Sequence, residues 1–295
     1  MKYGFIGCGN MGGAIARALS NSTKDITLSD ISGKDKILAA ELGVSHADNA
    51  SVAANCDRIF LAVKPHLMKG ALAPLQEILA QKKPLLITMA AGLEIRQIEE
   101  FVGTRLPIIR IMPNTPTAIG KGVIQYCCND LVEEAILADW LADMVPCGLL
   151  DNLDESLIDA ASALSGSGPA YMYVFLEALA DGAVACGVPR AKAYEYAAMT
   201  MIGSAEMYMK TKTHPRCSEG RCLLPRRQHH RRSAGHGRKR FPLRRHRRCH
   251  CHLPAQQGTG KVSIQQLQQK GRLCRPFVIA FYSFIQYNKK KNLEE

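Results

Sequence analysis

Gly7, Gly9 and Gly12 have the spacing G-x-G-x-x-G and lie where a short apolar segment passes into helix-forming residues. In this pattern the first glycine permits a tight turn, the second lets a pyrophosphate approach the backbone, and the third lets helix and strand pack closely. The N-terminus of the following helix then offers free N–H groups to an anion. The spacing predicts a dinucleotide site, although an ordinary glycine-rich turn could also have it.

An acidic residue further along the chain strengthens this prediction. Residues 26–29 read Ile-Thr-Leu-Ser and lead into Asp30, eighteen residues after Gly12. A carboxylate at about this position bonds the adenosine ribose in dinucleotide-binding folds. Asp30 favours NAD because its charge repels a 2′-phosphate, whereas Lys34 and Lys36 could compensate for that charge. The sequence therefore leaves NAD and NADP open.

The elements that must position these residues alternate between two types up to about residue 152. Strands are predicted at 58–63, 84–89, 108–112, 123–127 and 147–150, and helices at 34–42, 50–55, 68–79, 93–101 and 130–143. This alternation predicts an α/β fold of the Rossmann type, with a doubly wound and mostly parallel sheet. In such sheets ligands bind outside the carboxyl ends of the strands.

The pattern becomes wholly helical after residue 152, with helices predicted at 154–164, 169–187 and 189–209. Between the first two, residues 165–169 read Ser-Gly-Ser-Gly-Pro. Such a turn at a helix start exposes several N–H groups and favours an anion such as a carboxylate. It is equally compatible with a plain linker.

Four motifs occur in a fixed order along the chain. Residues 7–12 read Gly-Cys-Gly-Asn-Met-Gly, 62–65 Ala-Val-Lys-Pro, 112–116 Met-Pro-Asn-Thr-Pro, and 164–171 Leu-Ser-Gly-Ser-Gly-Pro-Ala-Tyr. Together they resemble the pyrroline-5-carboxylate reductase family over about residues 2–215. The last motif is specific to that family, whereas many dehydrogenases share the first.

The resemblance implies reduction of the cyclic imine 1-pyrroline-5-carboxylate to L-proline by hydride transfer from NADP or NAD, in a homodimer or higher homo-oligomer. Such an enzyme mainly aligns donor and acceptor, so the resemblance implies no metal and no nucleophile. It places the substrate carboxylate near Ser165, Gly166, Ser167 and Gly168. No side chain stands out as a proton donor. The implied cofactor contacts are Gly7, Cys8, Gly9, Asn10, Met11, Gly12, Asp30, Asn49, Ala62, Val63, Lys64, Pro65, Met89, Ala90 and Ala91.

Related hydroxyacid dehydrogenases share this architecture and are the rival enzyme class. They use a helix lysine of the second domain as acid and base. Lys192 lies on a predicted helix, but the accompanying pattern is absent.

The predicted domains are an NAD(P)-binding domain at 1–152, a partial helical domain for substrate and dimerisation at 153–215, and a disordered basic tail at 216–295.

Charge divides the chain sharply at this last boundary. Residues 1–215 hold 18 Lys and Arg against 23 Asp and Glu, whereas 216–295 hold 20 against 3. Residues 216–257 contain no Asp, Val, Ile or Tyr, so that stretch cannot bury a core. One alternative is therefore a cofactor-binding domain without catalysis, whose tail binds nucleic acid or zinc. Against it, the cysteine spacing is not a standard zinc motif, and a single aromatic residue, Phe241, lies among the arginines of residues 216–257.

A shifted reading frame accounts for the tail better. In the family, the helical domain continues after His-Pro through a Ser-Pro-Gly-Gly-Thr-Thr segment to closing helices. With permitted synonymous codons, residues 222–232 read one nucleotide later give Val-Cys-Ser-Pro-Gly-Gly-Asn-Thr-Ile-Ala-Gly, and residues 237–259 give an amphipathic helix. We interpret this as a nucleotide lost or gained near codons 215–217. The chain is then predicted to have impaired reductase activity and exposed apolar helix faces.

Bulk properties limit the remaining classes. The first strand begins directly after Met1-Lys2, and no apolar run approaches the length of a membrane span. The 11 cysteines of this 295-residue chain are best read as reduced thiols. These features predict a cytoplasmic protein.

Overall fold

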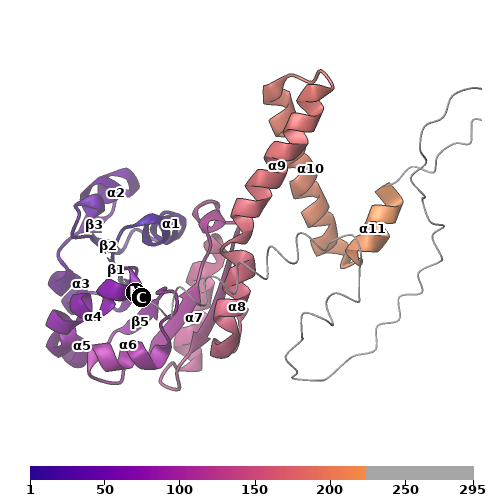
Figure 1. Cartoon of the computed structure of the whole chain (residues 1–295). Helices are drawn as coiled ribbons and strands as arrows, with labels where there is room; N and C mark the ends of the chain where they lie inside the picture. Colours follow the sequence, from indigo (N-terminus) through magenta and orange to yellow (C-terminus); the bar gives the residue numbers. More distant parts are fainter. Residues whose placement is uncertain (223–295) are drawn as a thin grey trace, which may run out of the picture. The chain divides into compact units, whose positions relative to one another are not determined.

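The computed structural model describes residues 1–222, which divide into two compact units, residues 1–194 and 195–222. Figure 1 shows these residues as ribbons. Most of the predicted basic tail, including its arginine clusters, the frameshifted segment and the zinc or nucleic-acid alternative, lies outside the described residues.

The first unit is built on one sheet of eight strands in the order β3-β2-β1-β4-β5-β6-β7-β8. Neighbouring strands are parallel except for β6 and β7, which are antiparallel. The prediction of a mostly parallel sheet is confirmed. The strands are β1 Tyr3–Ile6, β2 Ile26–Ser29, β3 Ser45–His46, β4 Arg58–Leu61, β5 Leu85–Thr88, β6 Ile108–Met112, β7 Gly122–Cys128 and β8 Gly148–Asn152.

Helices cover both faces of this sheet, which explains why its central strands are apolar on both sides. Side chains of α1, α2 and α7 join one buried cluster, and those of α3, α4, α5, α6 and α8 join another. These helices are α1 Asn10–Leu19, α2 Lys34–Leu42, α3 Asn49–Asn55, α4 Pro65–Leu72, α5 Gln76–Lys82, α6 Ile95–Val102, α7 Glu134–Met144 and α8 Glu155–Ser165.

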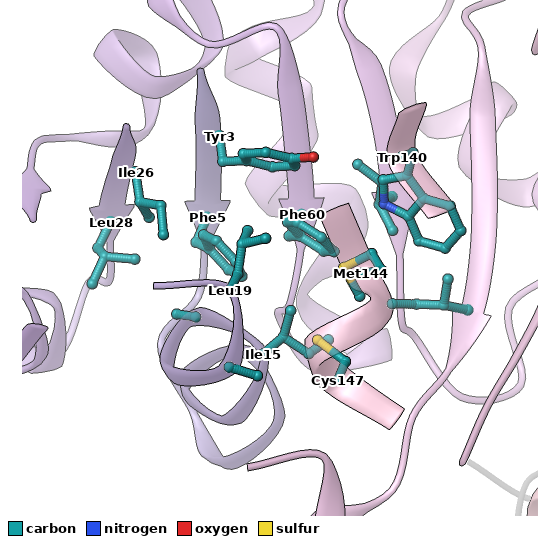
Figure 2. Close-up of a cluster of buried hydrophobic side chains, with 14 of the residues drawn as sticks. Tyr3, Phe5, Ile15, Leu19, Ile26, Leu28, Phe60, Trp140, Met144 and Cys147 are labelled. Atoms are coloured by element: carbon teal, nitrogen blue, oxygen red, sulfur yellow. The ribbon is translucent and has the colours of Figure 1, made fainter. Parts of the chain in front are cut away.

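The first cluster is aromatic at its centre (Figure 2). The rings of Phe5 and Phe60 stack with centroids 4.6 Å apart, and Ile15 of α1 and Met144 of α7 are also buried in this cluster. Burial of these apolar side chains is the main force that holds α1 against the sheet. The glycine loop that precedes α1 is thereby fixed at the end of β1.

One predicted helix is interrupted in the structure. The sequence predicts a single helix over residues 68–79, but the chain forms α4, a 3-10 turn η1 at Ala73–Leu75, and then α5. Pro74 explains the break, because proline lacks the N–H that a continuous helix requires. The first of these helices also begins earlier than predicted, with Pro65 in its first turn.

The predicted run of helices after residue 152 is confirmed. After α8 come α9 Gly168–Ala185 and α10 Arg190–Thr211, which crosses the division between the two units. The prediction of disorder from Arg216 is wrong for the first residues, because Pro215–Cys222 forms α11. A composition that cannot bury a core does not prevent a short helix, whose backbone hydrogen bonds are local.

Two further observations apply to residues 1–222. No helix there is long and apolar enough to cross a membrane. Nor does any group of three or more His, Cys, Asp or Glu side chains in that range have an arrangement that could hold a metal ion.

Candidate functional site

The glycine loop after β1 makes two close backbone approaches. Gly7 has φ +103°, and a Cβ there would lie 2.6 Å from the carbonyl oxygen of Ala62. A Cβ on Gly12 would lie 2.4 Å from the carbonyl oxygen of Gly7. Both positions therefore require glycine for the packing of β1, α1 and the residues after β4.

Gly9 differs from these two glycines. A Cβ there would meet no atom within 4 Å, so the second glycine faces open space. It is also the N-cap of α1, and that helix has no acidic residue in its first turn. Unsatisfied N–H groups and a positive dipole end thus face a space into which an anionic group can come close to the backbone.

Asp30 follows β2 and contacts this loop. Its carboxylate accepts hydrogen bonds from the backbone N–H of Cys8, at 2.7 Å, and from the backbone N–H of Ser32, at 2.8 Å. Partial burial would raise the pKa of the Asp30 carboxyl, but the hydrogen bonds from Ser32 and Cys8 and the charge of Lys34 together lower it. The group is therefore ionised near neutral pH and remains an acceptor on its remaining lone pairs.

A cavity of about 390 Å³ opens beside Asp30. This volume lies within the range of small-molecule sites. Asn49, the first residue of α3, lines it and lies 2.7 Å by its Oδ1 from the hydroxyl of Ser29, which donates to it. The cavity wall is mostly apolar, with Ile31, Val63 and Leu67 beside the polar Asp30 and Asn49. An apolar wall with a carboxylate and an amide at its edge is suited to bind the adenine ring and the ribose of a dinucleotide.

The other predicted cofactor contacts follow β4 and β5 at the same sheet edge. The backbone N–H of Ala62 donates to the carbonyl oxygen of Ile6 at 2.8 Å, and that of Met89 donates to the carbonyl oxygen of Leu61 at 3.3 Å. Lys64 is exposed and is the N-cap of α4, and Ala90 is buried. The structure thus brings together at one edge the strand ends that carry the predicted residues, because parallel strands end on the same side.

Sequence reasoning missed part of the cavity. His66, Gly70 and Ala71 of α4 also line it. His66 was not predicted because the helix was expected to begin at Met68, whereas Gly70 and Ala71 lay inside the predicted helix with no motif to mark them. The signal was Pro65, which favours the first turn of a helix and so marks an earlier start.

The turn at residues 165–168, where the substrate carboxylate is predicted to bind, does not line this cavity. Helix α8 ends at Ser165, and α9 begins at Gly168 with no side-chain cap on its first N–H groups. The side-chain amide of Asn114 donates to the carbonyl of Ser165 at 2.9 Å. Asn114 follows β6 and leads into η2, Thr115–Ile119, which packs against α1. The turn is thus linked to the glycine loop through η2 and α1.

The fold and this sheet edge define a dinucleotide-binding oxidoreductase with a helical region after the Rossmann domain. Comparisons with known proteins agree. A family model described as pyrroline-5-carboxylate reductase dimerisation matches residues 155–222. Residues 2–92 match one described as NADP oxidoreductase, coenzyme F420-dependent.

Individual relatives specify the family. The pyrroline-5-carboxylate reductase of Escherichia coli (strain K12) is 38% identical over 220 residues, which are 72% of this chain and 81% of that protein. Pyrroline-5-carboxylate reductase 3 of Danio rerio is 39% identical over 69% of this chain and 72% of its own length. The solved structure of Plasmodium falciparum pyrroline carboxylate reductase with NADP bound has a TM-score of 0.69 and 31% identity, and covers 76% of this chain and 85% of its own. The chain belongs to the pyrroline-5-carboxylate reductase family.

Proposed function

We propose that this chain reduces 1-pyrroline-5-carboxylate to L-proline with NAD(P)H, using the glycine loop for the cofactor and the turn at residues 165–168 for the substrate. The observation that supports this proposal most is the structural connection between the glycine loop and the turn at residues 165–168. Helix α1, which follows the glycine loop, packs against η2, and Asn114 immediately before η2 bonds to Ser165. Both binding groups thus belong to one continuous packed body.

The cofactor, when bound, supplies the hydride, and the chain's residues supply its position. Gly9 leaves room for the pyrophosphate, and the N-terminus of α1 stabilises its charge. The Asp30 carboxylate accepts hydrogen bonds from a ribose hydroxyl. Asn49, Val63 and their neighbours, which line the cavity, would hold the adenosine end.

The substrate carboxylate binds at the turn between α8 and α9. The N–H groups of a first helical turn have no intrahelical partners, and the positive dipole end favours an anion. Gly168 begins α9, and Pro169 follows it. Held there, the substrate would have its imine carbon oriented for hydride transfer, and such alignment lowers the barrier to reaction.

Residues 155–222 carry the dimerisation region of the family, and we propose a homodimer or higher homo-oligomer. This region has apolar side chains on its surface. In the first unit Tyr173 and Val174 of α9 are 67% and 65% exposed, and in the second unit Met199 of α10 is 65% exposed. Contact with a second copy would remove such side chains from water. The start of the match at 155 also supports the proposed domain boundary at 152/153.

The altered sequence after Pro215 affects turnover in this proposal. It replaces the Ser-Pro-Gly-Gly-Thr-Thr segment that the family has at this place. We expect cofactor binding to be retained and turnover to be lowered, because the glycine loop and its contacts lie within residues 1–194.

The test is oxidation of NADH or NADPH by the full-length chain with and without the imine, together with detection of L-proline. Imine-dependent oxidation that yields proline is the expected result. A matched control is the Gly9→Ala variant, because an added Cβ would narrow the cofactor approach without meeting any atom of the fold within 4 Å. Oxidation that is equally fast without the imine would contradict the proposal.

A further inference from the structure

Ser32, two residues after Asp30, gives both of its hydrogen-bond donors to that carboxylate. Its backbone N–H donates to Oδ1 of Asp30 at 2.8 Å, and its hydroxyl donates to the same oxygen. The other oxygen, Oδ2, accepts the backbone N–H of Cys8 at 2.7 Å. Because three donors from two segments hold this carboxylate, its remaining lone pairs point in fixed directions.

Asp30 lies between two neighbouring hollows of the surface. It lines the cavity of about 390 Å³ that takes the adenosine end in the proposed function. It also lines a second recess of about 760 Å³, which shares Asp30, Ile31 and Asn49 with the first. A ribose bonded to Asp30 would have its 2′ oxygen at the boundary of the two hollows, so a 2′-phosphate would enter the second recess.

The second recess carries more negative than positive charge. Asp30, Asp35 and Asp48 line it, and Lys36 is the only lysine or arginine that lines it in the part of the chain that the structure describes. His46 lines it as well, but its Nδ1 lies 3.8 Å from a carboxylate oxygen of Asp35. A phosphate in this recess would approach three carboxylates, and like charges repel more strongly near a protein surface than in bulk water.

The lysine that is nearest to Asp30 in the sequence lines a different hollow. Lys34, together with Gly9 and Arg17, lines a hollow of about 260 Å³ beside the glycine loop. Gly9 is the N-cap of α1, so a cation at this hollow is placed to meet the pyrophosphate. Of the two lysines that could compensate for the charge of Asp30, only Lys36 thus lines the recess that a 2′-phosphate would enter.

We propose that Asp30 and Ser32 together make this chain selective for NADH, because Asp30 occupies the donors with which Ser32 would otherwise bind a 2′-phosphate. A backbone N–H and a hydroxyl are suitable donors to a phosphate, and both are used by the carboxylate. A ribose hydroxyl therefore meets an oriented acceptor, whereas a phosphate meets negative charge and no free donor of Ser32. The inference rests on the proposed function, since it assumes that the adenosine end of the cofactor binds beside Asp30.

The test is fluorescence titration of NADH and of NADPH into the full-length chain and its variants. The unmodified chain is expected to bind NADH at least about tenfold more tightly than NADPH. Asp30→Ala is expected to lower the ratio of the Kd for NADPH to the Kd for NADH by at least about tenfold, because it removes the charge and frees Ser32. Alanine is used because the side-chain oxygen of an asparagine would still accept hydrogen bonds from Ser32.

Ser32→Ala is expected to act differently in the two backgrounds. In the unmodified chain it is expected to leave the Kd for NADPH within about twofold, because the hydroxyl is bonded to Asp30. In the Asp30→Ala chain it is expected to raise the Kd for NADPH about tenfold and to leave the Kd for NADH unchanged, because the freed hydroxyl then donates to the phosphate. This change of effect separates an occupied donor from a serine that has no part in cofactor binding.

Ser156→Ala is the matched control. Ser156 donates to Asp154 by its backbone N–H, at 2.9 Å, and by its hydroxyl, as Ser32 does to Asp30, but at the start of α8. This variant is expected to change neither Kd.

Two results would overturn the inference and leave the proposed function intact. One is NADPH binding as tight as NADH binding in the unmodified chain, and the other is a weaker affinity for NADPH in the Ser32→Ala single variant, which would mean that Ser32 already holds the phosphate. Binding of neither cofactor to the unmodified chain would instead overturn the cofactor site of the proposed function, and this inference with it.

Discussion

Gly9 and Gly12 belong to the same motif but meet different surroundings, so substitution separates two of its roles. A Cβ on Gly12 would lie 2.4 Å from a backbone oxygen, whereas one on Gly9 would meet nothing within 4 Å. Gly12→Ala is therefore expected to lower the free energy of unfolding by about 1–3 kcal/mol, the usual cost of overpacking. Thermal unfolding without cofactor measures this change.

Gly9→Ala is expected to leave the unfolding temperature unchanged and to weaken NAD(P)H binding at least about tenfold. The backbone at Gly9 has φ −69°, which alanine adopts without strain. The added methyl group occupies the space through which the pyrophosphate approaches. Fluorescence titration of NAD(P)H measures the affinity, and undiminished affinity would contradict the assignment of this loop.

Asp30 gives a second prediction at the scale of one residue. Asp30→Asn keeps an acceptor for the N–H of Cys8 but removes the negative charge at the ribose position. Because a 2′-phosphate is repelled by that charge, the ratio of the Kd for NADPH to the Kd for NADH is expected to fall by roughly tenfold. Titration of both cofactors measures the ratio, and a ratio that rises would show that Asp30 does not face the 2′ position.

At the scale of an element, α8 depends on one buried arginine. Arg110 is 1% exposed, and its loss leaves the carboxylates of Glu155 and Asp159 without their partner. Arg110→Ala is expected to lower the free energy of unfolding by about 1.5–3 kcal/mol, because it removes charge-assisted hydrogen bonds while the two carboxylates, 32% and 56% exposed, stay in contact with water. Urea unfolding of the full-length chain measures this cost.

Arg105 is the matched control for Arg110. Its side chain is 60% exposed and pairs with Asp130 and Glu99. Such surface pairs contribute about 0–1 kcal/mol, so Arg105→Ala is expected to change stability little. Equal effects of the two substitutions would mean that the contact of α8 with the sheet does not depend on Arg110.

At the scale of the whole molecule, the tail after Pro215 is expected to lower turnover without changing cofactor binding. A chain whose residues from 216 onward are replaced by the product of the shifted reading frame regains a Ser-Pro-Gly-Gly segment. We expect its kcat to exceed that of the present chain by at least about tenfold, or about 1.4 kcal/mol in the barrier, with an unchanged Kd for NAD(P)H. Imine-dependent NAD(P)H oxidation compares the two chains. Equal kcat values would show that the altered tail does not impair the enzyme.

Local patterns were sufficient for the sheet and the glycine loop. Strands buried on both faces leave continuous apolar runs, and the loop leaves a glycine spacing, so both can be read without tertiary information. Asp48 caps α3, and its side chain accepts the N–H of Ser51 at 2.7 Å, as aspartate commonly does at this position. The break at Pro74 was missed, because the helical spacing of apolar residues continues across this single proline. Helix α11 was missed, because the composition of the tail does not reveal the local hydrogen bonds that form a short helix.

The contacts of Ser165 could not be predicted in the same way. Asn114 and Gln125 lie 51 and 40 residues before it, and no periodicity connects them. A polar residue inside the apolar strand 123–127 was the one available signal. The assignments of substrate and cofactor residues, the domain boundary and the cytoplasmic location stay predictions.

The sequence by itself determined the fold class, the family and the position of the dinucleotide loop, because each depends on residue types at short and regular spacing. Only the tertiary structure decided which polar side chains meet. The antiparallel turn from β6 to β7 puts Asn114 and Gln125 beside the end of α8, and burial then requires each of them to find a hydrogen-bond partner. That partner is Ser165, so the contact depends on how the strands and α8 pack.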